Sequence, residues 1–177
     1  MKTCVALAAW LLLGTPATEA AREPAPRVEF QGAARVVDGD TLVVTDARDL
    51  VKHRVRLYGL DAPESKQQCT LSNGTLWACG VQAGDALRER IGNASVHCVT
   101  VDTDRYGRDV GVCDTGSDRP LNSWLVSSGW ALAYRQYGGA QFDADEAQAK
   151  ANHVGVWQGT LQAPWEWRQA QRRSAAG

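Results

Sequence analysis

The feature that most constrains the fold is a series of short β-rich segments separated by polar turns. Residues 35–45 and 51–60 are rich in β-branched side chains, and the polar run Asp46-Ala47-Arg48-Asp49 separates them. A second pair of segments, 95–101 and 108–114, surrounds another polar turn. Short runs of this kind around tight turns are typical of paired antiparallel strands. We therefore expect these four segments to form hairpins.

Helical stretches lie between and after these strands, with recognisable ends. We expect one helix over 80–91 that stops at Gly92, and two more that begin with Asp118 and Asp143 as N-caps. The second stretch has Leu121, Trp124 and Leu125 at helical spacing, so these side chains should pack inward. Strands interrupted by one helix and followed by two more favour an OB-type barrel with helices against it, an α+β fold.

The N-terminus has the pattern of an export signal. Lys2 precedes the apolar run 5–13, and Thr18-Glu19-Ala20 resembles a small-x-small cleavage site. We expect residues 1–20 to be a signal peptide and 21–27 a flexible lead-in, with the protein periplasmic or secreted; an N-terminal membrane anchor is the alternative. No later apolar run is long enough to span a bilayer, so no membrane contact is expected of the mature chain.

Export changes the interpretation of the cysteines. Cys4 lies in the signal, so four of the 5 cysteines remain, and an even number in an oxidising compartment indicates disulfides. Cys98 and Cys113 flank the later turn symmetrically and should pair across the hairpin, which leaves Cys69 to pair with Cys79. A four-cysteine zinc site is the alternative, although the chain has no Cys-x-x-Cys pair.

The overall charge limits the partners that the chain can bind. The formal net charge is −1, whereas proteins that coat nucleic acid carry an extended basic face. An enzyme that contacts one or two phosphates needs only local positive charge. The charge therefore excludes broad, non-specific duplex coating and leaves a local phosphate site open.

Charged residues scattered along the β-rich half make chemical sense as one site. They are Asp40, Arg56, Asp61, Glu64 and Arg108. Carboxylates with a backbone carbonyl suit calcium, which takes oxygen ligands. Arginine forks match phosphate oxygens and stay charged at any working pH, and a glutamate can accept a proton from water. The set predicts a phosphodiester-cleaving site.

Asp40, Arg56 and Arg108 also have purely structural interpretations. Asp38-Gly39-Asp40 can be a simple turn or bulge, although alternation would also place both aspartates on one face near a cation. Arg56 shares a strand face with Arg54 and can be solvated there, and Arg108 can be a turn arginine. The three histidines, His53, His97 and His153, are scattered and are interpreted as surface or packing residues.

Three polar blocks, in order, resemble the signature of the staphylococcal nuclease (thermonuclease) family. They are Val37-Asp38-Gly39-Asp40-Thr41, residues 56–64, and Asp104-Arg105-Tyr106-Gly107-Arg108. Residues 121–126 with Gly129 and Tyr134, then 146–150 and Gly155-Val156-Trp157, resemble its C-terminal helices. The likeness covers 28–159, which we interpret as the domain, and implies a five-stranded OB-type barrel with three α-helices.

The resemblance also implies roles for individual residues. Asp40 and Asp61 become calcium ligands, and Ala62, where the family usually has threonine, offers its carbonyl. Arg56, Glu64 and Arg108 become the catalytic trio, and Arg105 and Tyr106 match substrate-binding positions. The implied activity is calcium-dependent hydrolysis of DNA and RNA that leaves 3′-phosphate ends. We also expect single-stranded DNA or RNA to be the favoured substrate and the enzyme to be a monomer. The cysteine-bracketed loop after Glu64 departs from the best-known member of the family, which bears on substrate preference more than on chemistry.

Two alternatives to a nuclease remain. The same barrel often serves as a catalytically silent module that binds nucleic acid. An exported domain could also act on a polysaccharide or a protein and use its carboxylates structurally. Residues 160–177 form a C-terminal tail in which Pro164-Trp165-Glu166-Trp167 could clamp onto the domain, and its final arginine-rich stretch is expected to be disordered.

Overall fold

The computed structural model describes residues 27–177. The expected signal peptide over 1–20 and almost all of the lead-in over 21–27 therefore lie outside the described residues. Within the described part, no helix is both long and apolar enough to cross a membrane.

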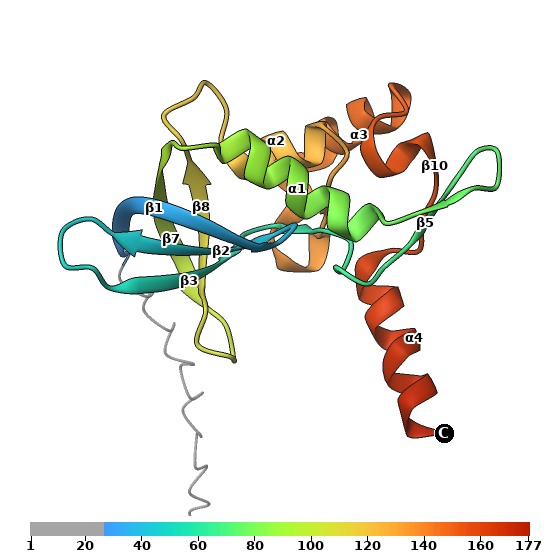
Figure 1. Ribbon diagram of the computed structural model, residues 1–177, viewed down its shortest axis with the longest axis horizontal. Coiled ribbons are helices and arrows are strands. Elements are labelled where there is room, and N and C mark those ends of the chain that lie inside the picture. The colour runs from blue at the N-terminus through green and yellow to red at the C-terminus, as the bar shows by residue number, and fades with distance from the viewer. Residues whose placement is uncertain (1–26) are drawn as a thin grey trace, which may run out of the picture.

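Five strands close into a barrel in the order β1-β2-β3-β8-β7. Their bounds are β1 Glu29–Asp38, β2 Thr41–Asp46, β3 Lys52–Leu57, β7 Ser95–Thr103 and β8 Asp109–Asp114. Neighbouring strands are antiparallel except β3 and β8, whose parallel pairing closes the barrel. The barrel and the two expected hairpins are thus confirmed, but segment 35–45 is not one strand: β1 and β2 are separate strands joined by a tight turn at Gly39-Asp40. Figure 1 shows the barrel at one end of the molecule and most of the helices at the other.

Alternation along the strands builds the barrel core. On β3, Val55 and Leu57 point inward and are buried, whereas Arg54 is exposed and Arg56 partly exposed on the other face. Cys98 on β7 lies opposite Cys113 on β8, and their disulfide is buried. Period-two patterning therefore sends the apolar residues inward and leaves Arg56 facing the groove described below.

The second β-rich segment is not one continuous strand. The chain turns at Tyr58 and Gly59, and a two-residue strand, β4 Leu60–Asp61, then pairs with β9 Leu132–Ala133. Gly59 has a φ of 78°, and a Cβ there would meet the ring of Phe142. The expectation of a strand over 51–60 is wrong at this point, because a left-handed glycine redirects the chain and moves Asp61 onto a separate sheet.

The described residues contain four α-helices, one more than expected: α1 Cys79–Ile91, α2 Leu121–Ser127, α3 Asp143–Ala151 and α4 Pro164–Ala176. α1 packs Ala83, Leu87 and Ile91 on the barrel, and α2 packs Leu121 and Leu125. Both expected N-caps are wrong. α2 follows Pro120 rather than Asp118, and Asp143 lies inside α3, after Phe142.

Three short 3₁₀ helices connect these elements, η1 Arg135–Tyr137, η2 Gly139–Phe142 and η3 Gly155–Gln158. Asn122 joins α2 to the place where the barrel closes. Its fully buried amide donates to the carbonyls of Tyr58 (3.0 Å) and Gly111 (3.2 Å), and its oxygen accepts from the backbone N–H of Cys113 (3.1 Å). One side chain thus joins three backbone groups on both sides of the place where β3 and β8 pair.

The cysteine-bracketed loop and the C-terminal segment build a second, smaller core. The strands β5 Cys69–Leu71 and β6 Leu76–Trp77 form a hairpin stapled by the Cys69–Cys79 disulfide, and β10 Gly159–Thr160 pairs with β5. The buried residues Cys69, Cys79, Leu132 and Val156 pack there with Trp77, Trp157, Leu161, Ala163 and Trp165. This core lies beside the start of α4 (Figure 1).

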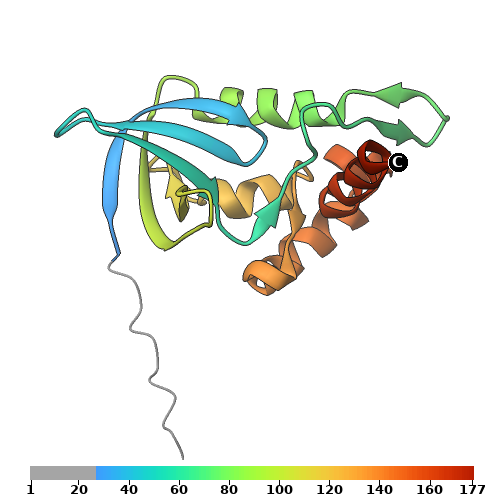
Figure 2. The ribbon, with the colours of Figure 1, turned by 90° about the horizontal axis from the view of Figure 1, so that it is seen from below.

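The arginine-rich end of the tail is helical, so the expectation of disorder is wrong. Pro164 occupies the first turn of α4, Glu166 lies near its start and Arg173 near its end. This order suits a helix, because proline is pre-shaped for the first turn and the charges oppose the helix dipole. Figure 2 shows α4 beside the other C-terminal helices, away from the barrel strands.

Candidate active site

The expected carboxylates and Arg56 meet at one end of the barrel. Asp40 follows the turn after β1, Arg56 lies on β3, and Asp61 ends β4. The Arg56 guanidinium pairs with the Asp40 carboxylate through one nitrogen and with Asp61 Oδ1 through the other at 2.6 Å. It also donates to the Leu60 carbonyl at 3.2 Å. One guanidinium thus bridges two carboxylates that are 21 residues apart in sequence.

Buried hydrogen bonds fix the Asp40 carboxylate. Its Oδ2 accepts from the backbone N–H of Ala62 at 2.9 Å, and its Oδ1 accepts from the Thr41 hydroxyl at 3.0 Å. The backbone of Asp40 accepts from the N–H of Leu57 at 2.9 Å. Because these donors come from β2, from β3 and from the residue after β4, Asp40 has little freedom to move.

Glu64 lies in the loop between β4 and β5, and the start of α1 and Gln67 hold that loop. The Gln67 side chain accepts from the Glu64 N–H at 3.2 Å and donates to the Gln162 carbonyl at 2.6 Å. A Cβ at Gly80 would collide with the Glu64 carbonyl, so glycine lets α1 approach closely. The Glu64 side chain remains 36% exposed and can reach solvent.

Arg108 lines the same groove, but among the described residues its ion pair is with Asp104 and not with Asp40, Asp61 or Glu64. Its Nε donates to Asp104 Oδ2 at 2.6 Å, and its backbone N–H donates to Asp104 Oδ1 at 3.0 Å. Burial alone would raise the pKa of Asp104, but hydrogen bonds from Arg108 and Tyr106 outweigh it, so the pKa is lowered. The ionised Asp104 carboxylate therefore fixes the position of the Arg108 guanidinium.

The two further substrate-binding candidates lie in the exposed turn between β7 and β8. Tyr106 is 70% exposed, and the Arg105 guanidinium lies 4.8 Å from its ring centroid. Arg105 also donates to the Tyr106 hydroxyl at 2.7 Å. Both residues line the groove together with Asp40, Glu64 and Arg108. The groove has a volume of about 930 Å³.

Sequence reasoning missed Arg168 on α4. Its Nη1 donates to Glu64 Oε1 at 2.7 Å and to Asp61 Oδ1 at 3.0 Å, and its Nη2 donates to Asp61 Oδ2 at 2.8 Å. Burial alone would lower the pKa of Arg168, but the hydrogen bonds that it donates to the Asp61 and Glu64 carboxylates outweigh burial and raise the pKa. Trp165, Arg168 and Arg172 stand at helical spacing in the sequence, which is the signal that could have placed them on one face.

The donor set fits a hard cation in its chemistry. Asp40 and Asp61 offer carboxylate oxygens and Ala62 a carbonyl, which are the ligand types that calcium takes. Within residues 27–177, no three His, Cys, Asp or Glu side chains cluster closely enough to hold a metal among themselves. Protein ligands would therefore supply only part of a coordination shell, and water or substrate oxygens would complete it. Asp38 instead accepts the Asp40 N–H at 3.2 Å.

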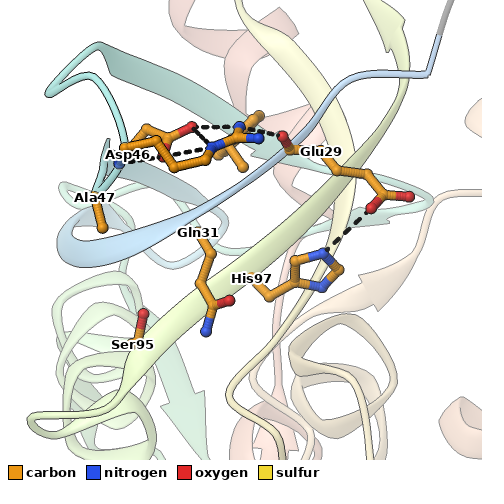
Figure 3. Close-up of a pocket in the computed structure, with 8 residues that line it drawn as sticks. Glu29, Gln31, Asp46, Ala47, Ser95 and His97 are labelled. Carbon is orange, nitrogen blue, oxygen red and sulfur yellow. Dashed lines mark hydrogen bonds and ion pairs between the residues drawn. The ribbon is translucent and has the colours of Figure 1, made fainter.

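A second hollow, shown in Figure 3, lies over β1, β2 and β7. Asp46 is held there by Arg48, whose Nη2 also donates to the Glu29 carbonyl, and His97 lies 3.9 Å from the Glu29 carboxylate. Hydrogen bonds from Arg48 lower the pKa of Asp46 to about 2. The expected site residues all lie elsewhere in the described part of the chain, so this hollow is not the candidate site.

The histidines behave as packing or surface residues in the structure. His53 stacks on Phe30 with ring centroids 3.8 Å apart and hydrogen-bonds Asp109 at 3.0 Å. His97 lies 3.3 Å from Asp114, and His153 is exposed. None of the three lines the groove that contains Asp40, as far as residues 27–177 show.

Comparison with known proteins agrees with this architecture. The sequence model described as "Staphylococcal nuclease homologue" matches residues 54–159. The chain is 33% identical over 159 residues to "Micrococcal nuclease" of Shigella flexneri, covering 82% of this chain and 84% of that protein. It is 31% identical over 136 residues to an "Uncharacterized endonuclease" of Escherichia coli, covering 76% and 81%.

A third relative has a different printed role. The chain is 32% identical over 127 residues to "Succinoglycan biosynthesis protein ExoI" of Rhizobium meliloti (strain 1021), covering 71% of this chain and 63% of that protein. The chain thus spans just under two thirds of that relative's length. The segment that matches the family model, residues 54–159, contains Arg56, Asp61, Glu64 and Arg108. This chain belongs to the family of staphylococcal nuclease homologues.

Proposed function

We propose that this protein is an exported, calcium-dependent nuclease that hydrolyses phosphodiester bonds in DNA and RNA. The observation that carries the proposal is the convergence of Arg56, Glu64 and Arg108 on the groove that Asp40 also lines, with the buried Asp61 paired to Arg56 beside it. Family membership and the names of the nuclease relatives support the same reaction class.

The roles follow from charge and position. Glu64 is the partly exposed carboxylate of the groove and would accept the proton of the attacking water. Arg56 and Arg108 would stabilise charge that develops on the phosphate oxygens, with Arg108 nearer the leaving oxygen. A cation held by Asp40, Asp61 and the Ala62 carbonyl would add positive charge beside the phosphate. Departure of the 5′ oxygen would leave a 3′-phosphate end.

Hydrolysis of a labelled single-stranded DNA by the purified mature protein tests the proposal. We expect cleavage with calcium and none with excess chelator. Arg56→Gln should lower the rate by about 10²-fold, on the scale of losing one stabilising donor. Arg54→Gln is the matched control, because Arg54 lies on the same strand but outside the groove.

The outcomes separate the alternatives. Binding of DNA without cleavage would favour a silent binding module, and neither binding nor cleavage would favour action on another substrate. Cleavage that persists in chelator would contradict the calcium requirement. Products that accept a 5′ label directly from a kinase, without prior dephosphorylation, would agree with 3′-phosphate ends.

Export is supported by the two disulfides, Cys69–Cys79 and Cys98–Cys113, because structural disulfides persist in oxidising compartments. We expect the protein in the periplasm or medium of the producing cell, with its N-terminus near Ala21. Recovery in the reduced cytoplasm with Met1 intact would contradict export.

A further inference from the structure

α4 lies outside the segment matched by the family, yet it forms part of the candidate groove. The match ends at residue 159, and α4 begins at Pro164. Trp165, Arg168 and Arg172 line the same groove as Arg108. These three side chains recur at helical spacing, so they share one face of α4. A helix beyond the matched segment thus faces the site.

We propose that α4 is a nucleic-acid-binding wall of the site, with Arg168 attaching the helix and Arg172 contacting a backbone phosphate of a single strand. This inference rests on the proposed nuclease function. In Figure 1, the turn between β7 and β8 and α4 both extend from the same side of the molecule. The groove residues include members of both elements. A strand lying along the groove would therefore pass from Arg108 toward α4.

Attachment of α4 depends on two contacts. The Arg168 guanidinium donates to Asp61 and Glu64, so its Nη atoms are occupied by protein carboxylates. The Trp165 ring stacks on Tyr134 with centroids 5.0 Å apart and an interplanar angle of 4°. Both contacts fix the first two turns of α4. The helix is therefore held against the reacting carboxylates rather than left free in solvent.

Arg172 is the group on this face that remains available to a ligand. It is exposed, it lines the groove, and it lies about one turn beyond Arg168, about 6 Å along the helix axis. Among the residues that the structure describes, no carboxylate pairs with it. An exposed guanidinium beside a groove matches a phosphate through two parallel hydrogen bonds.

The surroundings favour a single strand as the ligand. Proteins that bind single strands combine a positive groove with aromatic side chains, and this groove joins Arg172 to Tyr106, Tyr134 and Trp165. The formal net charge of −1 means that the attraction must be local, because the whole molecule has no positive excess. Five arginines and five aspartate or glutamate residues line the groove, and three of those arginines already pair with carboxylates. The attraction therefore falls to Arg105 and Arg172, for which residues 27–177 show no carboxylate partner.

The disulfide hairpin holds the chain that leads into α4. β10 pairs with β5 next to Cys69, and the Gln67 side chain donates to the Gln162 carbonyl at 2.6 Å. Pro164, the first residue of α4, is buried. The Cys69–Cys79 hairpin and α4 are therefore one structural unit.

Arg172→Gln and Arg173→Gln form a matched pair for the test. They are adjacent on α4, both are exposed, and they remove the same charge, but Arg173 does not line the groove. The measurements are the dissociation constant of a fluorescent single-stranded DNA in chelator at several salt concentrations, and KM and kcat for its cleavage with calcium. The mature, disulfide-bonded protein is used throughout.

We expect Arg172→Gln to raise the dissociation constant and KM about threefold to tenfold with kcat unchanged. It should also reduce the salt slope of log K by about 0.7, the value for one phosphate contact on a single strand. Arg173→Gln should match the wild type. Equal effects of the two variants, or none, would overturn the role of α4 even when the wild type cleaves DNA. A wild type that neither binds nor cleaves would instead overturn the proposed function.

Discussion

Replacing Arg168 with glutamine tests how the site balances its charges. Arg168 donates to Asp61, which is fully buried, and to Glu64, which is 36% exposed. Asp61 would keep one guanidinium partner, Arg56, at 2.6 Å. The variant therefore leaves the buried Asp61 carboxylate with one positive partner instead of two. We expect the free energy of unfolding to fall in the absence of calcium.

The size of this loss follows from the contact geometry. At 2.8 Å and an effective dielectric constant of about 20, the attraction between Arg168 and Asp61 is about 6 kcal/mol before desolvation. Breaking a fully buried pair costs about 3–5 kcal/mol. Arg168 is 30% exposed and Asp61 retains Arg56, so we expect about 2 kcal/mol. For a chain of this size, that loss lowers Tm by roughly 4–8 °C.

Calcium should compensate for the lost guanidinium. Arg168 uses oxygens of Asp61, one of the proposed ligands, so removing it takes away a competing positive charge. If the whole 2 kcal/mol is recovered on binding, calcium affinity rises about 30-fold. Because ligands stabilise a fold according to their affinity, the rise in Tm on adding calcium should be larger in Arg168→Gln than in the wild type.

Thermal unfolding in chelator and in a calcium series measures both effects, and calorimetric titration gives the calcium affinity independently of activity. Arg173→Gln is the control, because it removes a charge from the same helix without contacting either carboxylate. An equal calcium-induced rise in Tm for wild type and Arg168→Gln would refute the reasoning, and so would an unchanged calcium affinity.

Three further predictions concern stability. Asn122→Ala should cost about 3 kcal/mol in urea unfolding, because it removes three hydrogen bonds of a fully buried side chain; a loss no greater than that of exposed Asn93→Ala would contradict this. Burial alone would raise the pKa of Glu146, but hydrogen bonds, first from Lys150, outweigh it and hold the pKa below 4.5. The stability that the ionised Glu146 contributes is therefore complete above pH 4.5 and is lost as the pH falls through the folded-state pKa. Glu146→Gln should therefore flatten the acid side of a Tm-against-pH curve, and an unchanged slope would contradict this prediction. Replacing both Cys69 and Cys79 with serine should cost up to about 3 kcal/mol and make the chain after residue 160 cleave first in limited proteolysis; first cuts inside the barrel would show that the hairpin does not hold α4.

Much of the barrel could be predicted because its signals are local. Alternation puts Val55 and Leu57 on one face of β3 and Arg56 on the other, and the even spacing of Cys98 and Cys113 about a turn sets the hairpin register. Local signals were weaker at element ends. Asp118 and Asp143 are good N-cap residues, yet packing of the following helices begins α2 after Pro120 and α3 at Asp143 itself.

The sequence by itself determined the strand pattern, the cysteine pairing and the types of charged residue in the site. Only the tertiary structure decided that a turn at Gly59 places Asp61 on β4 rather than on β3, that Asp104 holds Arg108, and that Arg168 contacts Asp61, 107 residues away in sequence. The physical reason is that periodicity acts over a few residues, whereas the position of α4 depends on how the disulfide hairpin, β10 and Trp165 pack together. Contacts of that range arise only when the chain is folded.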